Sequence, residues 1–458
     1  MSFNLKKMYQ SKVAKGLPPV FLGLVYLLIT VLPVILIMTS GLPARVLPDE
    51  IATYLGLFAY IWILLSFLLS GRFRVISGKI GIDKTMRYHQ IMAVSLGVII
   101  FLHPYLYTLS MTQSVPWESS RQFYLSLTFV GFVSGMLAWI VVLGLIPIAI
   151  YRDELDFRYE TWRLIHGLTA VIVVIGGTIH VFDVGRYTNE IPALKFLWIS
   201  LIVLASLTLW RTYLIIPLLQ KRRPFKVVSI LPAAANTWDL TIASNSKKTF
   251  NFIAGQFVWL KLKPPQFALE ENPFSISSAP SDLPNIRLTI KEAGDTTNHI
   301  GEVKPGDVVY VDGPHGHFMI DGRTFAGILM IGGGVGVAPM IGVIREMVDN
   351  KDLRPVKLLY GNRTESQIAF KDELIEASKS INLEVDFALA EAPEGWQGHQ
   401  GNIDKVLIEK VLKTIEKPQD WLFLLCGPPG MLDYNVGILN ANGINNHQIE
   451  YEKFSYLS

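Results

Sequence analysis

HQIMAVSLGVIIFLH at residues 89–103 and HGLTAVIVVIGGTIH at residues 166–180 are two apolar segments that each begin and end with histidine. In both segments the histidines are 14 residues apart, and these four are the only histidines in the first half of the chain. Fourteen residues of α-helix make about 3.9 turns and rise about 21 Å, so both histidines lie on nearly the same face at opposite ends of a bilayer-length helix. Burial of an imidazole in hydrocarbon is costly unless the ring binds a partner. Imidazole is a common axial ligand of haem iron. The repeated spacing therefore predicts two b-type haems stacked between two membrane helices.

The composition predicts a fusion of a membrane domain with a soluble domain. Half of the 458 residues are hydrophobic and the mean hydropathy is positive, yet 17% are charged and most of these lie in the second half. A membrane span needs about 20 apolar residues. Five uncharged runs reach that length, and a sixth is weaker because it contains Lys195 and Arg211 near its ends, where long side chains can reach the interfaces. The six predicted spans are 16–44, 51–71, 88–117, 122–151, 164–182 and about 192–214.

Basic residues predict the orientation of these spans. The first apolar run follows four lysines and is longer than a signal-peptide core, so we expect it to be retained, with the amino terminus inside. Lys and Arg gather between spans two and three and between spans four and five, whereas the opposite loops contain few. The chain is thus expected to be a multi-pass protein of the cell membrane, with its amino terminus and carboxyl-terminal half in the cytoplasm.

This orientation pairs the histidines by depth. We expect His89 and His166 to hold an inner haem, and His103 and His180 an outer one, between facing helices of a six-helix bundle. The only cysteine, Cys426, excludes an intramolecular disulfide and a cysteine-ligated iron–sulfur cluster. The net charge of +3 is small, and the basic residues 221–223 fit a juxtamembrane stop signal better than nucleic-acid binding.

The soluble half contains two patterns. From residue 224, short β-branched and aromatic runs broken by Gly, Pro, Asn and Asp predict an antiparallel β-barrel. From about residue 325, strands alternate with helices, which predicts an open, mostly parallel α/β sheet. The predicted domains are a transmembrane haem-binding bundle at 1–220, a barrel at 224–322 and an α/β domain at 323–458.

Two compact turns in the α/β domain follow predicted strands. The turn GGGVGVAP at residues 332–339 opens a predicted helix, where bare backbone amides can receive a pyrophosphate. The segment LLCGPPGM at residues 424–431 places a second turn after a strand, at the sheet edge where ligands of open α/β sheets bind.

With these motifs the chain resembles the ferredoxin–NADP reductase superfamily and, with the histidine helices attached, the ferric reductase and NADPH oxidase family. The resemblance extends from about the second span to the carboxyl terminus. It is most specific in the paired histidines, the two turns, NPFSISS at residues 272–278 and DGPHG at residues 312–316.

The resemblance implies an FAD site and an NAD(P) site. In the family, the residues matching Phe274 and Ser275 lie against the flavin ring and its edge. The residue matching Phe454 covers the flavin face, a role that Tyr456 could hold instead, and Cys426 would line the nicotinamide site. These residues are the predicted catalytic set. Asn272 stands where family members usually carry His or Arg. The implied cofactor-binding residues are Asn272, Pro273, Phe274, Ser275, Lys291, Gly294, Thr297, Gly332, Gly333, Gly334, Gly336, Pro339, Arg363, Cys426, Gly427, Pro428 and Phe454.

Arg363 follows the second strand of the α/β unit and could pair with a 2′-phosphate, but it also fits a simple surface position, so NADPH and NADH both stay open. The function implied is that of an NAD(P)H oxidase or ferric-chelate reductase, passing electrons from cytoplasmic NAD(P)H through FAD and two haems to an outside acceptor, oxygen or ferric iron. A haem-containing electron-delivery subunit for a quinone-linked or periplasmic partner is an alternative. A transporter with a histidine proton relay is another. No EF-hand pattern appears.

Overall fold

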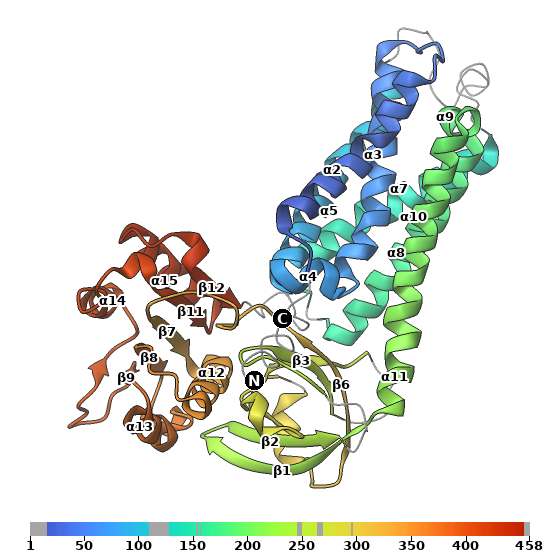
Figure 1. The fold of residues 1–458 in the computed structure, drawn as a ribbon. Coiled ribbons are helices and arrows are strands. Elements are labelled where there is room, and N and C mark those ends of the chain that lie inside the picture. The colour runs from blue at the N-terminus through green and yellow to red at the C-terminus, as the bar shows by residue number, and fades with distance from the viewer. Residues whose placement is uncertain are drawn as a thin grey trace, which may run out of the picture. The chain divides into compact units, whose positions relative to one another are not determined.

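The computed structural model describes residues 16–109, 128–152, 154–155, 157–244, 250–262, 269–294 and 296–452 (Figure 1). These residues form two compact units, one from residue 16 to 215 and one that starts at residue 216. The first unit is helical, and the second contains two β-sheets with their helices.

Within the described residues, six helices are long and apolar enough to cross a membrane. Two of them, α5 and α8, begin five or more residues before the predicted apolar runs, because the helical backbone continues through the charged residues that precede each run. The sixth helix likewise continues past its predicted end, through a π-helical turn at Arg211–Ile215 and the short helix α11 (Ile216–Arg222). The spans are α2 (Pro19–Thr39), α3 (Leu47–Ser70), α5 (Ile82–Thr108), α7 (Phe129–Ile150), α8 (Tyr159–Val184) and α10 (Pro192–Trp210) with its extension; the short helices α4 (Arg74–Ile80) and α9 (Arg186–Glu190) lie between spans.

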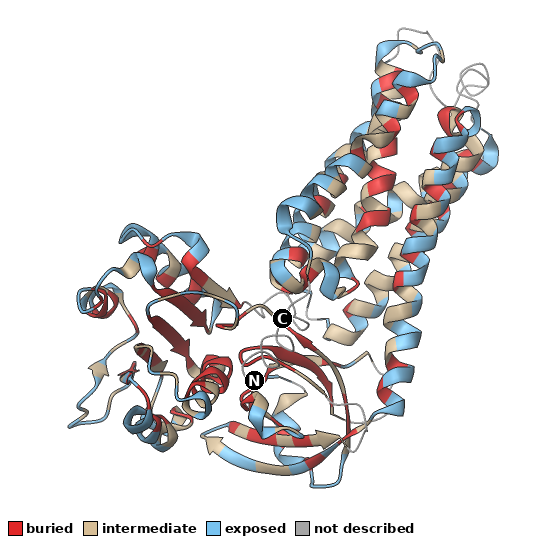
Figure 2. Cartoon of the chain, in the orientation of Figure 1, coloured by how far each residue is buried: buried red, intermediate tan, exposed pale blue. Residues whose placement is uncertain are grey.

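Helix α3 is the most enclosed span of the bundle. It packs against α2, α5, α8 and α10, and its residues Ala59, Ile61 and Leu64 are almost fully buried. Much of the surface of the other spans is exposed (Figure 2). Their exposed apolar side chains include Met38, Phe129 and Phe196, which are 76%, 82% and 73% exposed. An apolar exterior of this size is typical of helices that face lipid.

The first sheet of the second unit is antiparallel, with strand order β4-β3-β6-β1-β2-β5. An isolated bridge between Ile276 and Leu288 connects the end of β4 to β5, so the sheet curls back on itself. Buried aliphatic and aromatic side chains from these strands form its core. The strands are β1 (Phe225–Ala234), β2 (Thr237–Ser244), β3 (Phe257–Lys261), β4 (Asn272–Ser275), β5 (Asn285–Lys291) and β6 (Val308–His315).

The second sheet is parallel, with strand order β10-β9-β8-β7-β11-β12. Its central strands are apolar on both faces: in β7, Ile328 and Met330 join one core, whereas Leu329 and Ile331 join the other. A parallel sheet covered by helices on both faces has this pattern. The strands are β7 (Ile328–Gly333), β8 (Val356–Asn362), β9 (Leu383–Leu389), β10 (His399–Gln400), β11 (Leu422–Cys426) and β12 (Ile449–Glu452), and the helices are α12 (Val337–Asn350), α13 (Lys371–Ser380), α14 (Lys405–Leu412) and α15 (Pro429–Ala441). The predicted fold class, a six-helix transmembrane bundle followed by an antiparallel barrel and an open α/β sheet, is confirmed.

Candidate functional site

The bundle brings the four histidines of α5 and α8 together in two pairs. His89 lies next to His166, and His103 lies next to His180. In each pair the ring centroids are 6.3 Å apart, and the ring planes are inclined by 73° and 88°. These are the two pairs predicted from the histidine spacing and the orientation of the spans.

The gap within each pair fits one metal ion held from two sides. Two imidazoles that each form a bond of about 2 Å to one metal ion, in line, have ring centroids about 6 Å apart. In the described part of the chain, no group of three or more His, Cys, Asp or Glu side chains gathers as a metal site. Each pair would therefore supply only two ligands, as haem iron requires when the porphyrin supplies the others.

An apolar layer separates the two pairs. Leu96 and Val173 lie midway along the two histidine segments, and they pack with Ala59 and Val142 into one buried cluster. Trp62 packs against this cluster from α3. The pairs are thus two separate sites, one above the other, with hydrocarbon between them.

Sequence reasoning missed two buried carboxylates at the start of α3. Asp49 is 0% and Glu50 5% exposed, and the Tyr187 hydroxyl donates to Glu50 at 2.8 Å. The same helix turn reaches the outer pair, because Thr53 and Tyr107 form a hydrogen bond of 3.0 Å and the Tyr107 ring lies against His103. No local motif reveals this group, since its members come from three distant helices.

The segment Asn272–Ser275 forms strand β4, which pairs with β3. Ser275 is buried, whereas Asn272, Pro273 and Phe274 are half-buried, and Phe274 contacts the barrel core. Lys291 is the last residue of β5. Beyond Gly294, the Thr297 hydroxyl accepts the Ala293 amide at 3.0 Å and starts a short 3₁₀ helix, so that hydroxyl is engaged in a local turn.

The two turns of the α/β domain lie against each other at the carboxyl edge of the parallel sheet. Gly332 and Gly333 end β7, and residues 334–336 form one 3₁₀ turn before α12, which contains Pro339. A Cβ on Gly336 would lie 2.2 Å from the Cys426 carbonyl oxygen, and a Cβ on Gly427 would lie 3.2 Å from the Gly333 Cα. Gly334 adopts a φ of +55°. Only glycine permits so close an approach of the two backbones.

Cys426 lies at the centre of this edge. In the register of the sheet it stands between Gly332 on one side and Glu452 on the other. Glu452 is buried, and its carboxylate is close to Gly316 of the barrel, where an added Cβ would lie 2.6 Å from an oxygen of Glu452. Glu452 is not among the site residues predicted from the sequence, although it lies two residues before Phe454. Phe454 and Tyr456 lie outside the described residues.

Burial, and secondarily the charge of Glu452, raises the pKa of the Cys426 thiol. A raised thiol pKa favours the neutral form, so we expect no thiolate at neutral or mildly alkaline pH. Iodoacetamide at pH 8 should leave the native protein almost unlabelled and should label the same chain fully after unfolding in guanidinium. Mass spectrometry measures the extent of labelling in the native and in the unfolded protein directly, because Cys426 is the only cysteine in the sequence. Stoichiometric labelling of the native protein at pH 8 would contradict this expectation.

Arg363 follows β8 and forms a surface ion pair. Its Nε donates to Glu391 at 2.7 Å, and the side chains of Arg363 and Glu391 are 71% and 56% exposed. The arginine lies at the same sheet edge as the glycine turn, since β8 pairs with β7 in parallel.

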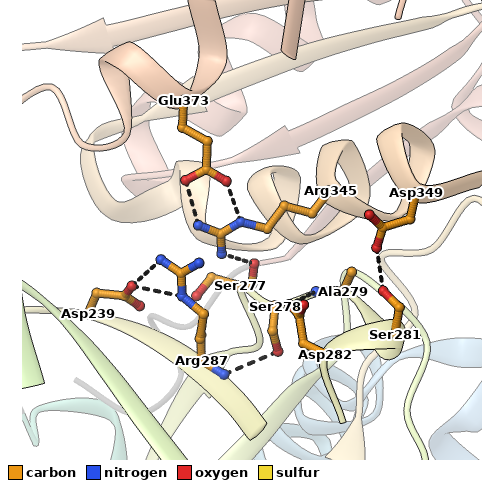
Figure 3. Close-up of polar contacts among 10 residues, drawn as sticks. All are labelled: Asp239, Ser277, Ser278, Ala279, Ser281, Asp282, Arg287, Arg345, Asp349 and Glu373. Atoms are coloured by element: carbon orange, nitrogen blue, oxygen red, sulfur yellow. Dashed lines mark hydrogen bonds and ion pairs between the residues drawn. The ribbon is translucent and has the colours of Figure 1, made fainter. Parts of the chain in front are cut away.

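A polar contact joins the barrel to α12 (Figure 3). Arg345 donates to the Ser277 carbonyl at 2.5 Å, and its guanidinium also donates to both carboxylate oxygens of Glu373, at 2.5 Å and 2.7 Å. One turn earlier, a Cβ on Gly342 would lie 2.8 Å from the Ile276 carbonyl oxygen. Because α12 starts at the glycine turn and Ser277 follows β4, this contact fixes the turn relative to that strand.

Replacement of Arg345 with methionine keeps an unbranched apolar side chain and removes the guanidinium that makes these contacts. A hydrogen bond to a charged group contributes about 1.5–3 kcal/mol. We therefore expect the KM for NAD(P)H to rise at least about tenfold when the intact protein reduces ferricyanide. Arg354→Met is the matched control, because Arg354 pairs with Asp352 two residues earlier. Equal KM values in the two variants would show that the contact does not position the turn.

Three protein families match successive parts of the chain. The ferric reductase like transmembrane component matches residues 55–177, the oxidoreductase FAD-binding domain matches residues 225–320, and the oxidoreductase NAD-binding domain matches residues 330–436.

Individual relatives match shorter parts. The reductase component of propane 2-monooxygenase from Mycolicibacterium goodii is 27% identical over 238 residues, which are 50% of this chain and 67% of the relative. NADH-cytochrome b5 reductase 1 from Lodderomyces elongisporus is 39% identical over 145 residues, which are 31% of this chain and 47% of the relative. A cytochrome P450 reductase structure from Amycolatopsis is 22% identical with a TM-score of 0.46, covering 51% of this chain and 69% of the other. The chain thus spans between 47% and 67% of the length of these two curated relatives.

Six helices long and apolar enough to cross a membrane, followed by regions that match an FAD-binding and an NAD-binding oxidoreductase domain, are the parts of a transmembrane oxidoreductase. The chain has the domain combination of the ferric reductase and NADPH oxidase family, in which a ferric reductase-like transmembrane domain is fused to this flavin and nucleotide module.

Proposed function

We propose that this protein holds FAD in its barrel and two b-type haems in its bundle, and that it delivers electrons from NAD(P)H to a small acceptor on the opposite side of the membrane. The acceptor is molecular oxygen, giving superoxide, or a ferric chelate. The observation that carries the proposal is the pairing of four imidazoles at two levels, with 6.3 Å between ring centroids in both pairs.

His89 and His166 would hold the inner haem, and His103 and His180 the outer one. Haem bound there would supply one-electron redox chemistry. The chain's own contribution is to place the imidazoles on opposite sides of each gap and to separate the gaps with the apolar layer of Leu96 and its neighbours. This layer excludes water and ions from the space between the two sites.

In the soluble half, the proposed cofactor-binding residues gather from both sheets. The β4 residues Phe274 and Ser275 would lie against FAD, while the backbone amides of the glycine turn at 332–336 would receive the nucleotide pyrophosphate. Cys426, buried and neutral, would line the nicotinamide site as a small apolar surface. Hydride transfer to flavin needs no acid–base dyad, so the residues serve to position the cofactors.

The distribution of basic residues supports a cytoplasmic location for the flavin and nucleotide domains. The short helix α4 and its flanks contain Arg72, Arg74 and Lys79, and these lie on the same side of the bundle as the α7–α8 connection with Arg152 and Arg158. Six spans return the chain to the side on which it began. The positive-inside rule assigns that side to the cytoplasm. The division at 1–220, 224–322 and 323–458 is part of the same proposal.

Anaerobic reduction of the purified full-length protein tests this function. We expect NADPH or NADH to bleach the flavin band first and then to produce a reduced b-type haem spectrum, and oxygen or ferric citrate to reverse both. Reoxidation by oxygen with superoxide release would identify an oxidase, and reoxidation by ferric citrate alone a ferric reductase. A protein without a haem spectrum, or haem that NAD(P)H never reduces, would refute the proposal.

A further inference from the structure

The outer pair of histidines is held by backbone carbonyls of neighbouring helices. His103 Nδ1 lies 2.7 Å from the Ala52 carbonyl oxygen of α3, and His180 Nδ1 lies 2.8 Å from the Gly131 carbonyl oxygen of α7. A carbonyl oxygen can only accept, so Nδ1 carries the hydrogen in both rings. In a neutral imidazole the other nitrogen, Nε2, then has a free lone pair for a metal.

A glycine stands four residues after each of these carbonyls. A Cβ on Gly56 would lie 2.6 Å from Cε1 of His103, and a Cβ on Gly135 would lie 2.4 Å from Nδ1 of His180. Residues four apart share one face of a helix, so each carbonyl and its glycine form a single flat platform beneath an imidazole. The platform has the same construction on α3 and on α7. Both imidazole rings fit only because the glycine has no side chain, since real Cβ atoms do not approach other atoms so closely.

The inner pair lacks this support within the described residues. Nδ1 of His89 and Nδ1 of His166 are buried without a hydrogen-bond partner there, and neither ring is among the nearest atoms to a Cβ added at any described glycine. The two sites therefore differ in the surroundings of their ligands, although their ring separations are equal.

We propose that Gly56 and Gly135 are positioning residues for the outer haem, and that their platforms set its reduction potential apart from that of the inner haem. This inference rests on the proposed function. A hydrogen bond from Nδ1 makes imidazole a more basic ligand, which favours ferric over ferrous iron. Alanine at either glycine would push the ring off its platform and break that bond, while the inner site would keep its surroundings.

Gly135→Ala tests the proposal against Gly144→Ala, a matched control in the same helix, since nothing lies within 4 Å of a Cβ at Gly144. Gly56→Ala is the second test variant, with Gly23→Ala in α2 as its control for the same reason. Each full-length protein is purified with its haems. Haem content, low-spin electron paramagnetic resonance signals and a potentiometric titration of the haem bands are then measured.

We expect wild type and both controls to hold two haems with the same two midpoint potentials. In the Gly56 and Gly135 variants, one potential should rise or one haem should be missing, while the other haem keeps its potential and its resonance signal. Unchanged potentials and signals in both test variants, or equal damage to both haems, would overturn the inference while leaving the proposed function intact. Wild-type protein without haem would instead overturn the proposed function.

Discussion

His103→Ala is expected to lower the haem content from two per chain to one and to reduce electron delivery to an outside acceptor to background. Loss of a residue that only hydrogen-bonds to a metal ligand lowers metal affinity or activity about 10–100-fold. Removal of the ligand itself should therefore lower haem affinity and electron delivery at least about 100-fold. NAD(P)H should still bleach the flavin at the wild-type rate, because His103 belongs to the helical unit and the region that matches an FAD-binding domain belongs to the other unit. Pyridine haemochromogen content and stopped-flow absorbance measure these two quantities.

His447→Ala is the matched control, since His447 is an exposed residue of the soluble unit. It should retain two haems and full delivery to the outside acceptor. If His103→Ala also retained two haems per chain, His103 would not be a ligand, and the pairing with His180 would have to serve another purpose.

Gly336→Ala should abolish flavin reduction by NAD(P)H while both haems remain reducible by dithionite. The new Cβ would lie 2.2 Å from the Cys426 carbonyl oxygen and 2.8 Å from the Gly427 amide nitrogen, so the two turns must move apart. Overpacking of this kind costs about 1–3 kcal/mol of stability, and here the strain falls on the segment expected to receive the pyrophosphate. Anaerobic stopped-flow with NADH and with NADPH measures the loss.

Gly437→Ala provides the comparison for this variant, because nothing lies within 4 Å of a Cβ at that position of α15. It should reduce its flavin as fast as wild type. Wild-type flavin reduction in Gly336→Ala would exclude the glycine turn from the nucleotide site.

The fold follows from local patterns that a single sequence can display. Five uncharged runs of bilayer length and a sixth run with charges only near its ends predicted all six spans. The succession of strand, turn and helix around Gly332 predicted the parallel sheet. Helix ends were less predictable: α5 begins at Ile82 and α8 at Tyr159, because hydrogen-bonded helix continues through polar residues once a span has formed.

The site was only partly predictable, because many of its contacts join residues that are far apart in the sequence. The histidine pairs follow from one spacing that occurs twice, and the structure brings the same residues together. The platforms at Gly56 and Gly135, the contact of Arg345 with Ser277 and the proximity of Glu452 to Gly316 join residues far apart in the sequence. Such contacts arise from tertiary packing, and no local pattern encodes them.

Electron transfer across a sealed bilayer tests the central claim most directly. The full-length protein is reconstituted into liposomes that contain trapped ferricyanide, and NADPH or NADH, neither of which crosses the bilayer, is added outside. We predict that the trapped ferricyanide is reduced, and that the His103→Ala variant leaves it oxidised while it still reduces ferricyanide added outside. If wild-type protein with both cofactors bound reduced only the external ferricyanide, the histidine pairs would not form a path through the membrane.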